Sequence, residues 1–271
     1  MARGEDIVGA LDYSLGRRRL VSDCELPWLA RADARGEADL TLTLRTRQEP
    51  RNAFRPWHES ETINIRRADD GALLARFPDG ATFLVTARRI ALVDAPREYT
   101  IDDLAAYALG PLLALALHQG GAVLIHASAV DAGGRALVFA GESGSGKSTT
   151  AAMFHRKGHR VLADDITEIA DGRALASIPA VRLRQPDGTK RIVPVAPSQD
   201  LPIGAVLFLD DRGTERLERL EPREGWKRLM ANAYTAHLPD AHMAQRIFEE
   251  CAALANRVPM YSYTAPLMEL P

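Results

Sequence analysis

Nine residues, Gly141 to Thr149, have the composition and order of a phosphate-binding loop. They read Gly-Glu-Ser-Gly-Ser-Gly-Lys-Ser-Thr, which contains the full Walker A pattern Gly-x-x-x-x-Gly-Lys-Ser. Glycines in such a loop let backbone N–H groups converge on phosphate oxygens. The nucleotide-binding residues predicted from this pattern are Gly141, Glu142, Ser143, Gly144, Ser145, Gly146, Lys147, Ser148 and Thr149. Lys147 would reach the β- and γ-phosphates, and the Ser148 hydroxyl would ligate Mg²⁺.

The segments on either side of the loop are those that phosphate binding requires. The apolar run Ala136 to Ala140 precedes the loop and predicts a buried strand, and Ala151 to Phe154 predict the start of a helix. A helix N-terminus adds partial positive charge next to a bound phosphate. We expect the helix to end near Gly158, a good residue to follow a helix. The complete pattern in this context disfavours a chance match in a glycine-rich turn.

Phosphoryl chemistry also needs a carboxylate near the metal, and two acidic pairs each follow an apolar strand. Asp164-Asp165 follow the segment 160–163, and Asp210-Asp211 follow the segment 205–209. The strand pattern favours Asp210-Asp211 as a Walker B element. The same residues also read as a hairpin turn that leads into residues 216–220. Spacing alone therefore leaves both pairs open.

Three linked motifs resemble the kinase core of bacterial HPr kinase/phosphorylase. They are Ile125-His-Ala-Ser-Ala-Val-Asp131, the loop from Gly141 to Thr149, and Lys157-Gly-His-Arg-Val-Leu-Ala-Asp-Asp165. In that family a His follows the first strand, and Arg-Gly-His-Arg-Leu-Val-Ala-Asp-Asp follows the helix after the loop. The third motif differs from this only by conservative changes at Lys157, Val161 and Leu162.

The resemblance implies an enzyme: a Ser kinase that uses ATP and Mg²⁺, with a nucleotide domain similar to that of ATP-dependent phosphoenolpyruvate carboxykinase. It assigns Asp164 as the general base for the acceptor hydroxyl and Asp165, with Ser148, as the metal ligands. It places His126 close to the transferred phosphate, where Lys147 and Mg²⁺ hold the developing charge. Without the resemblance, His126 would read as a core histidine at a strand end.

The sequence departs from the family downstream of the carboxylates. The signature Glu-Ile-Arg-Gly-Leu-Gly is absent, and residues 181–188 and Lys190-Arg191 stand in its place. Arg182, Arg184, Lys190 and Arg191 could supply phosphate-binding cations, and a solvated basic hairpin fits equally well. The chain is most similar to stand-alone relatives of HPr kinase, including lasso-peptide Ser kinases. The expected acceptor is thus a Ser hydroxyl of a peptide or protein other than HPr.

Two other functions stay open at this stage. One is a kinase for a small-molecule alcohol, and the other is a non-catalytic module that senses a nucleotide. The phosphate loop reads phosphates and not the base, so ATP and GTP are not distinguished. The family resemblance also raises the expectation of a homo-oligomer.

Composition sets further limits on the function. The chain has 271 residues, of which 46% are hydrophobic and 26% charged, as in an ordinary soluble protein. Its net charge of −2 points to neither nucleic acid nor an anionic membrane as a partner. Cys24 and Cys251 have no metal-ligand spacing, which favours a reducing, cytoplasmic setting. The apolar stretch 104–117 is shorter than the roughly 20 residues of a membrane span.

The expected fold is α/β, with a small antiparallel β domain at 1–99 and a P-loop kinase domain of the HPr kinase type at 100–271. Leu40, Leu42 and Leu44 alternate with polar residues as in a strand, and residues 72–86 read as a hairpin. Thr100 to Asp103 is an N-cap signal for a helix that runs toward Leu117 and kinks at Gly110-Pro111.

The remaining elements are expected in the kinase domain. Residues 166–177 form a hairpin about the Asp171-Gly172 turn. Helices are predicted at 223–236 and 241–256, and a last strand at 258–263.

Overall fold

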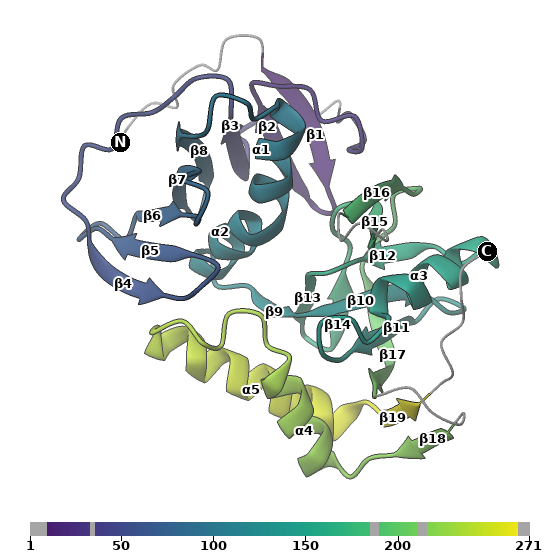
Figure 1. The fold of residues 1–271 in the computed structure, drawn as a ribbon. Coiled ribbons are helices and arrows are strands. Elements are labelled where there is room, and N and C mark those ends of the chain that lie inside the picture. The colour runs from purple at the N-terminus through teal and green to yellow at the C-terminus, as the bar shows by residue number, and fades with distance from the viewer. Residues whose placement is uncertain (1–9, 33–35, 185–189, 211–215, 265–271) are drawn as a thin grey trace. The chain divides into compact units, whose positions relative to one another are not determined.

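The computed structural model describes residues 10–32, 36–184, 190–210 and 216–264 (Figure 1). Over these residues the chain is a mixed α/β protein that divides into two units, Met1–Gly121 and Ala122–Pro271. The division falls after Gly121 and not after residue 99, because the helical segment that follows Thr100 packs on the sheet of the first unit.

The first unit contains an eight-stranded sheet in the order β1-β2-β3-β8-β7-β6-β5-β4. Its strands are β1 (Leu11–Leu15), β2 (Arg18–Ser22), β3 (Leu40–Thr43), β4 (Arg55–Glu59), β5 (Asn64–Arg67), β6 (Leu73–Arg76), β7 (Thr82–Thr86) and β8 (Arg89–Asp94). The predicted hairpin is formed by β6 and β7, which pair antiparallel. The alternating leucines 40, 42 and 44 are all buried, as a half-buried strand requires.

The prediction of an antiparallel sheet is wrong at one strand. β3 lies between β2 and β8 and is parallel to both. Parallel neighbours need long connections, and here residues 23–39 and 44–88 supply them. Sequence alternation identifies a strand but carries no information about which distant strand it joins, so this pairing was not predictable from local pattern.

The helical segment begins with the predicted capping box. The Thr100 hydroxyl accepts from the Asp103 N–H, and the Asp103 carboxylate accepts from the Thr100 N–H. The segment consists of α1 (Ile101–Tyr107), η1 (Ala108–Leu112) and α2 (Leu113–Gln119). Gly110, before Pro111, has non-helical angles of φ −112° and ψ −111°, which confirms the predicted kink.

One stretch of this segment, Ile101–Gln119, is long and apolar enough to cross a membrane by length and composition. However, 67% of its most apolar window is buried inside the protein, as in a core helix of a soluble protein. α2 packs on β7 and β8, and the Gln119 side chain donates to the Gly71 carbonyl oxygen at 2.6 Å.

The second unit contains a nine-stranded sheet with a central path β12-β10-β11-β17-β14-β13-β9, and a separate pair β15–β16. The strands are β9 (Val123–Ile125), β10 (Ala127–Asp131), β11 (Ala136–Ala140), β12 (Val161–Ala163), β13 (Thr167–Ala170), β14 (Arg173–Leu175), β15 (Ala180–Arg184), β16 (Lys190–Pro194), β17 (Leu201–Leu209), β18 (Arg216–Arg219) and β19 (Met260–Thr264). The helices are α3 (Lys147–Arg156), α4 (Pro222–Ala231) and α5 (Ala241–Arg257).

Strand β11, which leads into the phosphate loop, is buried on both faces. Ala136, Val138 and Ala140 pack in one apolar cluster with residues of α4 and α5. Phe139 points to the opposite face and packs in a second cluster with Ala151 of α3. Successive side chains of a strand alternate between faces, so one strand contributes to both clusters. In Figure 1, α3 accordingly lies on one side of this sheet and α4 and α5 on the other.

Two turn predictions have different outcomes. Asp171 (φ 52°) and Gly172 (φ 73°) are both left-handed and connect β13 to β14 as the predicted hairpin. The predicted hairpin after Asp210 is wrong, because β18 pairs with β19 and not with β17. β19 is parallel to β17 and lies between the two strands. Asp211 itself lies outside the described residues.

Candidate active site

The phosphate loop connects β11 to α3 as the sequence predicts. Gly141 follows β11 with φ 146°, and a Cβ there would lie 2.7 Å from the Leu209 carbonyl oxygen and 2.8 Å from Ser145 Oγ. No larger residue fits this position without a shift of backbone. Ser143 and Gly144 form the exposed turn of the loop, and Gly146 is the N-cap of α3.

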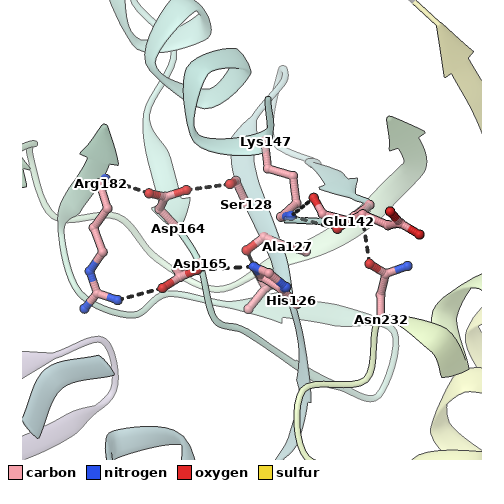
Figure 2. Close-up of polar contacts among 11 residues, drawn as sticks. His126, Ala127, Ser128, Glu142, Lys147, Asp164, Asp165, Arg182 and Asn232 are labelled. Atoms are coloured by element: carbon pink, nitrogen blue, oxygen red, sulfur yellow. Dashed lines mark hydrogen bonds and ion pairs between the residues drawn. The ribbon is translucent and has the colours of Figure 1, made fainter. Parts of the chain in front are cut away.

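Lys147 is the first residue of α3 and is only 6% exposed. Its Nζ donates to the carbonyl oxygens of Gly141 at 2.7 Å and Glu142 at 2.8 Å. A buried ammonium needs such acceptors, because burial without partners strongly disfavours its charge. The lysine side chain therefore bends back from α3, and its ammonium contacts the start of the loop (Figure 2).

The loop offers donors that suit an anion. Among the described residues, Ser145 Oγ is buried and has no hydrogen-bond partner. Buried polar groups are nearly always paired, so an unpaired hydroxyl in this loop marks a place for a ligand oxygen. Ser148 and Thr149 lie half-buried on the first turn of α3, where a helix N-terminus favours negative charge. These observations fit a nucleotide phosphate.

Asp164 follows β12 and is 8% exposed. Its Oδ1 accepts from the Ser128 hydroxyl at 2.5 Å, and its Oδ2 accepts from the Arg182 backbone N–H at 2.7 Å. Burial raises the pKa of this carboxyl above its usual value, against hydrogen bonds from Arg182, Ser128 and Ser148 that lower the pKa. The Ser148 hydroxyl, which the Walker A pattern assigns to Mg²⁺, is therefore a neighbour of Asp164.

Asp165 has a left-handed backbone with φ 72°, which is rare outside glycine. Such conformations cost about 1–3 kcal/mol and persist where neighbouring contacts hold them. Here Asp165 Oδ1 lies 3.3 Å from His126 Nε2, and Oδ2 accepts from Arg182 Nη1 at 3.0 Å. The two consecutive carboxylates contact different groups (Figure 2): Asp164 binds the Ser128 hydroxyl and the Arg182 backbone N–H, and Asp165 contacts the His126 ring and the Arg182 guanidinium.

His126 lies in the link between β9 and β10. Its backbone N–H donates to the Asn232 carbonyl oxygen at 2.8 Å. Its ring meets the Tyr234 ring edge to face, with centroids 5.9 Å apart. Burial, with a smaller effect of the Asp165 charge, raises the pKa of Tyr234 to about 12. His126 is therefore held by its backbone on one side and reaches Asp165 with its ring.

Arg182, on β15, contacts both carboxylates of the pair. Its N–H binds Asp164, its guanidinium binds Asp165, and its side chain is 12% exposed. The sequence suggested it as a phosphate-binding cation or part of a solvated hairpin, and the second of these is wrong for Arg182. The side chains of Arg184, Lys190 and Arg191 lie outside the described residues.

One residue of the site carries no sequence signal that we recognised. Asn232, which caps the C-terminus of α4, accepts from the Gly141 N–H through Oδ1 at 3.0 Å. Its carbonyl oxygen holds His126. An asparagine after a helix ordinarily reads as a cap, and Asn232 is far from every motif in the sequence.

Asp210, from the alternative acidic pair, follows β17, the strand parallel to β11. Its carboxylate accepts from Arg228 Nη1 at 2.8 Å and 3.0 Å and from the Ser262 hydroxyl. This carboxylate is thus engaged with α4 and β19. Within the described residues no group of three His, Cys, Asp or Glu side chains could hold a metal ion by itself.

The second unit thus brings together the phosphate loop with Lys147, the two carboxylates and His126. Hard oxygen ligands for Mg²⁺ are present in the Ser148 hydroxyl and the neighbouring carboxylates. A carboxylate beside a histidine ring, a pair that can act in acid–base chemistry, is present in Asp165 and His126. A separate cavity of about 350 Å³ between the ends of α5 and β18 is lined by residues 219–222 and 255–260 and includes none of these groups.

No family model matches the sequence. HPr kinase/phosphorylases from two strains of Clostridium botulinum are each 38% identical to this chain over 61 residues, which are 22% of this chain and 20% of theirs. The match therefore spans about a fifth of the length of these curated relatives. The solved HPr(Ser) kinase/phosphatase of Coxiella burnetii aligns with 12% identity and a TM-score of 0.28, over 54% of this chain and 79% of that one. The resemblance to HPr kinase/phosphorylase is confirmed over these 61 residues.

Proposed function

We propose that this HPr kinase-like chain is an ATP- and Mg²⁺-dependent phosphotransferase that acts on a hydroxyl. The proposed acceptor is a Ser of a peptide or protein other than HPr. The observation that carries the proposal is the convergence of Lys147, Asp164, Asp165 and His126 around one phosphate loop. A site that only held a nucleotide would have no use for a second carboxylate oriented by a histidine.

Lys147 is the group that would neutralise charge on the transferred phosphoryl oxygens. In this structure its ammonium is satisfied by the carbonyl oxygens of Gly141 and Glu142. Phosphate oxygens carry negative charge, so they attract this ammonium more strongly than the neutral carbonyls do. A bound nucleotide would therefore compete for Lys147 without any movement of α3.

The metal side of the site is best supplied by Ser148 and Asp164. The Ser148 hydroxyl lies close enough to Asp164 to lower the pKa of its carboxyl. An Mg²⁺ held there would neutralise negative charge on the nucleotide phosphates and orient them. Asp164 is buried and Asp165 only half-buried, so an acceptor hydroxyl reaches Asp164 less readily.

The acceptor side is best supplied by Asp165. Its side chain is 18% exposed, more open than that of Asp164, and His126 lies within 3.3 Å. A carboxylate in reach of an acceptor hydroxyl can take its proton while the phosphoryl group moves to the oxygen. The geometry thus favours roles opposite to those that the resemblance implied, with Asp164 next to the metal and Asp165 as the base.

The experiment is mass spectrometry of acceptors after incubation with Mg-ATP. We would offer Ser-containing peptides, small alcohols and HPr, each with the wild type and Lys147→Ala. A phosphate monoester on Ser peptides, formed by the wild type alone, supports the proposal. Phosphorylation of small alcohols alone would favour the small-molecule kinase. Nucleotide binding without any product would favour a nucleotide-sensing module, and a phosphorylated HPr would contradict the proposed acceptor class.

The setting of the protein is part of the same proposal. We place it in the cytoplasm, where ATP and reduced thiols are available, which suits the buried free thiols of Cys24 and Cys251. A homo-oligomer is the assembly that the family resemblance favours. Light scattering during size-exclusion chromatography measures the oligomeric state directly.

A further inference from the structure

We propose that Asn232 is a positioning residue that fixes the phosphate loop relative to His126. This inference rests on the proposed function, because the loop and His126 need a fixed relative position only if they act together in phosphoryl transfer. Asn232 contacts the first glycine of the loop with its side chain and the backbone of His126 with its carbonyl oxygen. The residue that ends α4 thereby joins two parts of the site that come from different strands; Figure 2 shows its side-chain contact.

The side-chain amide is matched to its two partners. Oδ1 accepts from the Gly141 N–H at 3.0 Å, and Nδ2 donates to the Arg228 carbonyl oxygen at 2.8 Å. An N–H partner requires an acceptor and a carbonyl partner requires a donor, so only one orientation of the amide satisfies both. Aspartate would meet the Arg228 carbonyl with a second acceptor, and serine has a single polar atom. Asparagine is the side chain with both groups at this length.

The helix that carries Asn232 is itself fixed. A Cβ on Gly225 would lie 2.6 Å from Met260 Sδ, so the glycine lets α4 approach β19 closely. Arg228 binds both oxygens of Asp210 at the end of β17, and Leu229 is buried in the core. Asn232 therefore projects from a helix end that is fixed on the central sheet. Its hydrogen bond with Gly141 fixes the loop relative to this helix.

The hydrogen bond with Asn232 holds the loop at Gly141, where the backbone has the least room to move. Gly141 presents its N–H to Asn232 and its carbonyl oxygen to Lys147. A shift at Gly141 therefore moves the acceptor that holds the lysine. Because Asn232 touches neither the lysine nor the carboxylates in any described bond, its effect passes through Gly141.

The test compares Asn232→Ala with Asn256→Ala as a matched control. Asn256 makes the same bond to the carbonyl four residues earlier, from Nδ2 to Ala252 O at 2.9 Å, on α5. Amide hydrogen exchange, read by mass spectrometry on peptides covering Gly141, should be about tenfold faster in Asn232→Ala. It should be unchanged in Asn256→Ala. Asn232→Asp keeps the acceptor for Gly141 and should retain the protection.

A kinetic measurement separates positioning from simple loss of stability. A variant that merely unfolds in part lowers kcat through its active fraction and leaves each KM unchanged. Asn232→Ala should instead raise the KM for ATP about tenfold and leave the KM for the acceptor unchanged. Unchanged exchange at Gly141, equal changes in both alanine variants, or an unchanged ATP KM would each overturn the proposal.

The proposal can still be tested if the wild type is inactive or if Asn232→Ala does not fold. If the wild type transfers no phosphoryl group, the proposed function fails, while Gly141 exchange and calorimetric ATP affinity still decide whether Asn232 positions the loop. If Asn232→Ala does not fold, Asn232→Ser, which is too short to reach Gly141 and retains a polar atom, takes its place with the same expected results.

Discussion

His126 Nε2 lies 3.3 Å from Asp165 Oδ1, although 38 residues separate them in the sequence. The sheet explains their proximity. β10 pairs antiparallel with β12, so the residue before β10 and the residues after β12 meet at the same edge. The histidine ring can orient the carboxylate. On this relationship we base the assignment of Asp165 to the acceptor.

We predict that Asp164 and Asp165 differ in role. Asp165→Asn removes the proton acceptor and should lower kcat by about 10²–10⁴-fold, with nucleotide binding nearly intact. Asp164→Asn removes a charge next to Ser148 and should weaken the affinity for Mg²⁺ about 10–100-fold. Calorimetric titration of Mg-ATP beside a transfer assay measures both effects.

Asp210→Asn is the control for this pair. Its carboxylate binds Arg228 and Ser262, so the variant should lose stability and keep its Mg²⁺ dependence. A metal defect in Asp210→Asn that Asp164→Asn and Asp165→Asn both lack would show that the acidic pair was chosen wrongly. A metal defect in Asp165→Asn alone would restore the roles that the resemblance implied.

We predict that Lys147→Ala lowers turnover by about 10²–10³-fold while the protein stays folded. The ammonium is placed to balance charge that develops on the phosphoryl oxygens. Lys157→Ala is the matched control, because Lys157 is exposed at the other end of α3. Steady-state turnover with Mg-ATP and circular dichroism are the measurements. Normal turnover in Lys147→Ala would mean that the loop does not hold the reacting phosphates.

The parts of the site that the sequence predicted are contiguous motifs. The glycine loop and the Asp164-Asp165 pair each combine chemistry and backbone requirement within a few residues, and His126 was found through its neighbours in the family motif. Asn232 could not be found in this way, because it lies 91 positions after Gly141 in the sequence. Its role depends on where α4 packs, which is a tertiary property. Arg182 was named from the sequence as a candidate cation, but its partners were not, because they follow another strand, β12.

In the fold, too, features set by neighbouring residues were predicted, and features set by distant contacts were not. The Asp171-Gly172 turn and the Thr100 capping box are set by neighbouring residues, and both were predicted. The position of β3 between β2 and β8, and that of β19 between β17 and β18, result from contacts between distant segments. Alternation of apolar residues fixes which face of a strand is buried and leaves the choice of partner strand open.

We predict a pH-dependent stability difference between Asp164→Asn and the wild type. Burial raises the pKa of Asp164 in the folded protein. The resulting stabilisation is fully present below the unfolded pKa and is lost as pH rises through the folded pKa. The uncharged Asn does not titrate. The unfolding midpoint of Asp164→Asn minus that of the wild type should therefore increase as pH rises above about 4, the ordinary pKa of an aspartate.

Thermal unfolding at a series of pH values, followed by circular dichroism, measures the difference. Asp69→Asn serves as a control for loss of an exposed carboxylate, since the Asp69 side chain is 87% exposed. A difference that stays flat or decreases with pH would contradict the burial of a charge at Asp164.

The last prediction concerns Arg182, whose guanidinium binds Asp165 at 3.0 Å. A charge-assisted bond of this kind contributes about 1.5–3 kcal/mol, so its loss in Arg182→Gln should lower kcat by about 10–100-fold. Because Asp165 faces the acceptor in our assignment, the KM for the acceptor should rise more than the KM for ATP. Arg216→Gln, which removes an exposed arginine paired with Glu218, should change neither. Steady-state kinetics with each substrate varied in turn separates the outcomes. A change in the ATP KM alone would assign Arg182 to the nucleotide, and unchanged kinetics would remove Arg182 from the site and leave acceptor recognition to another part of the chain.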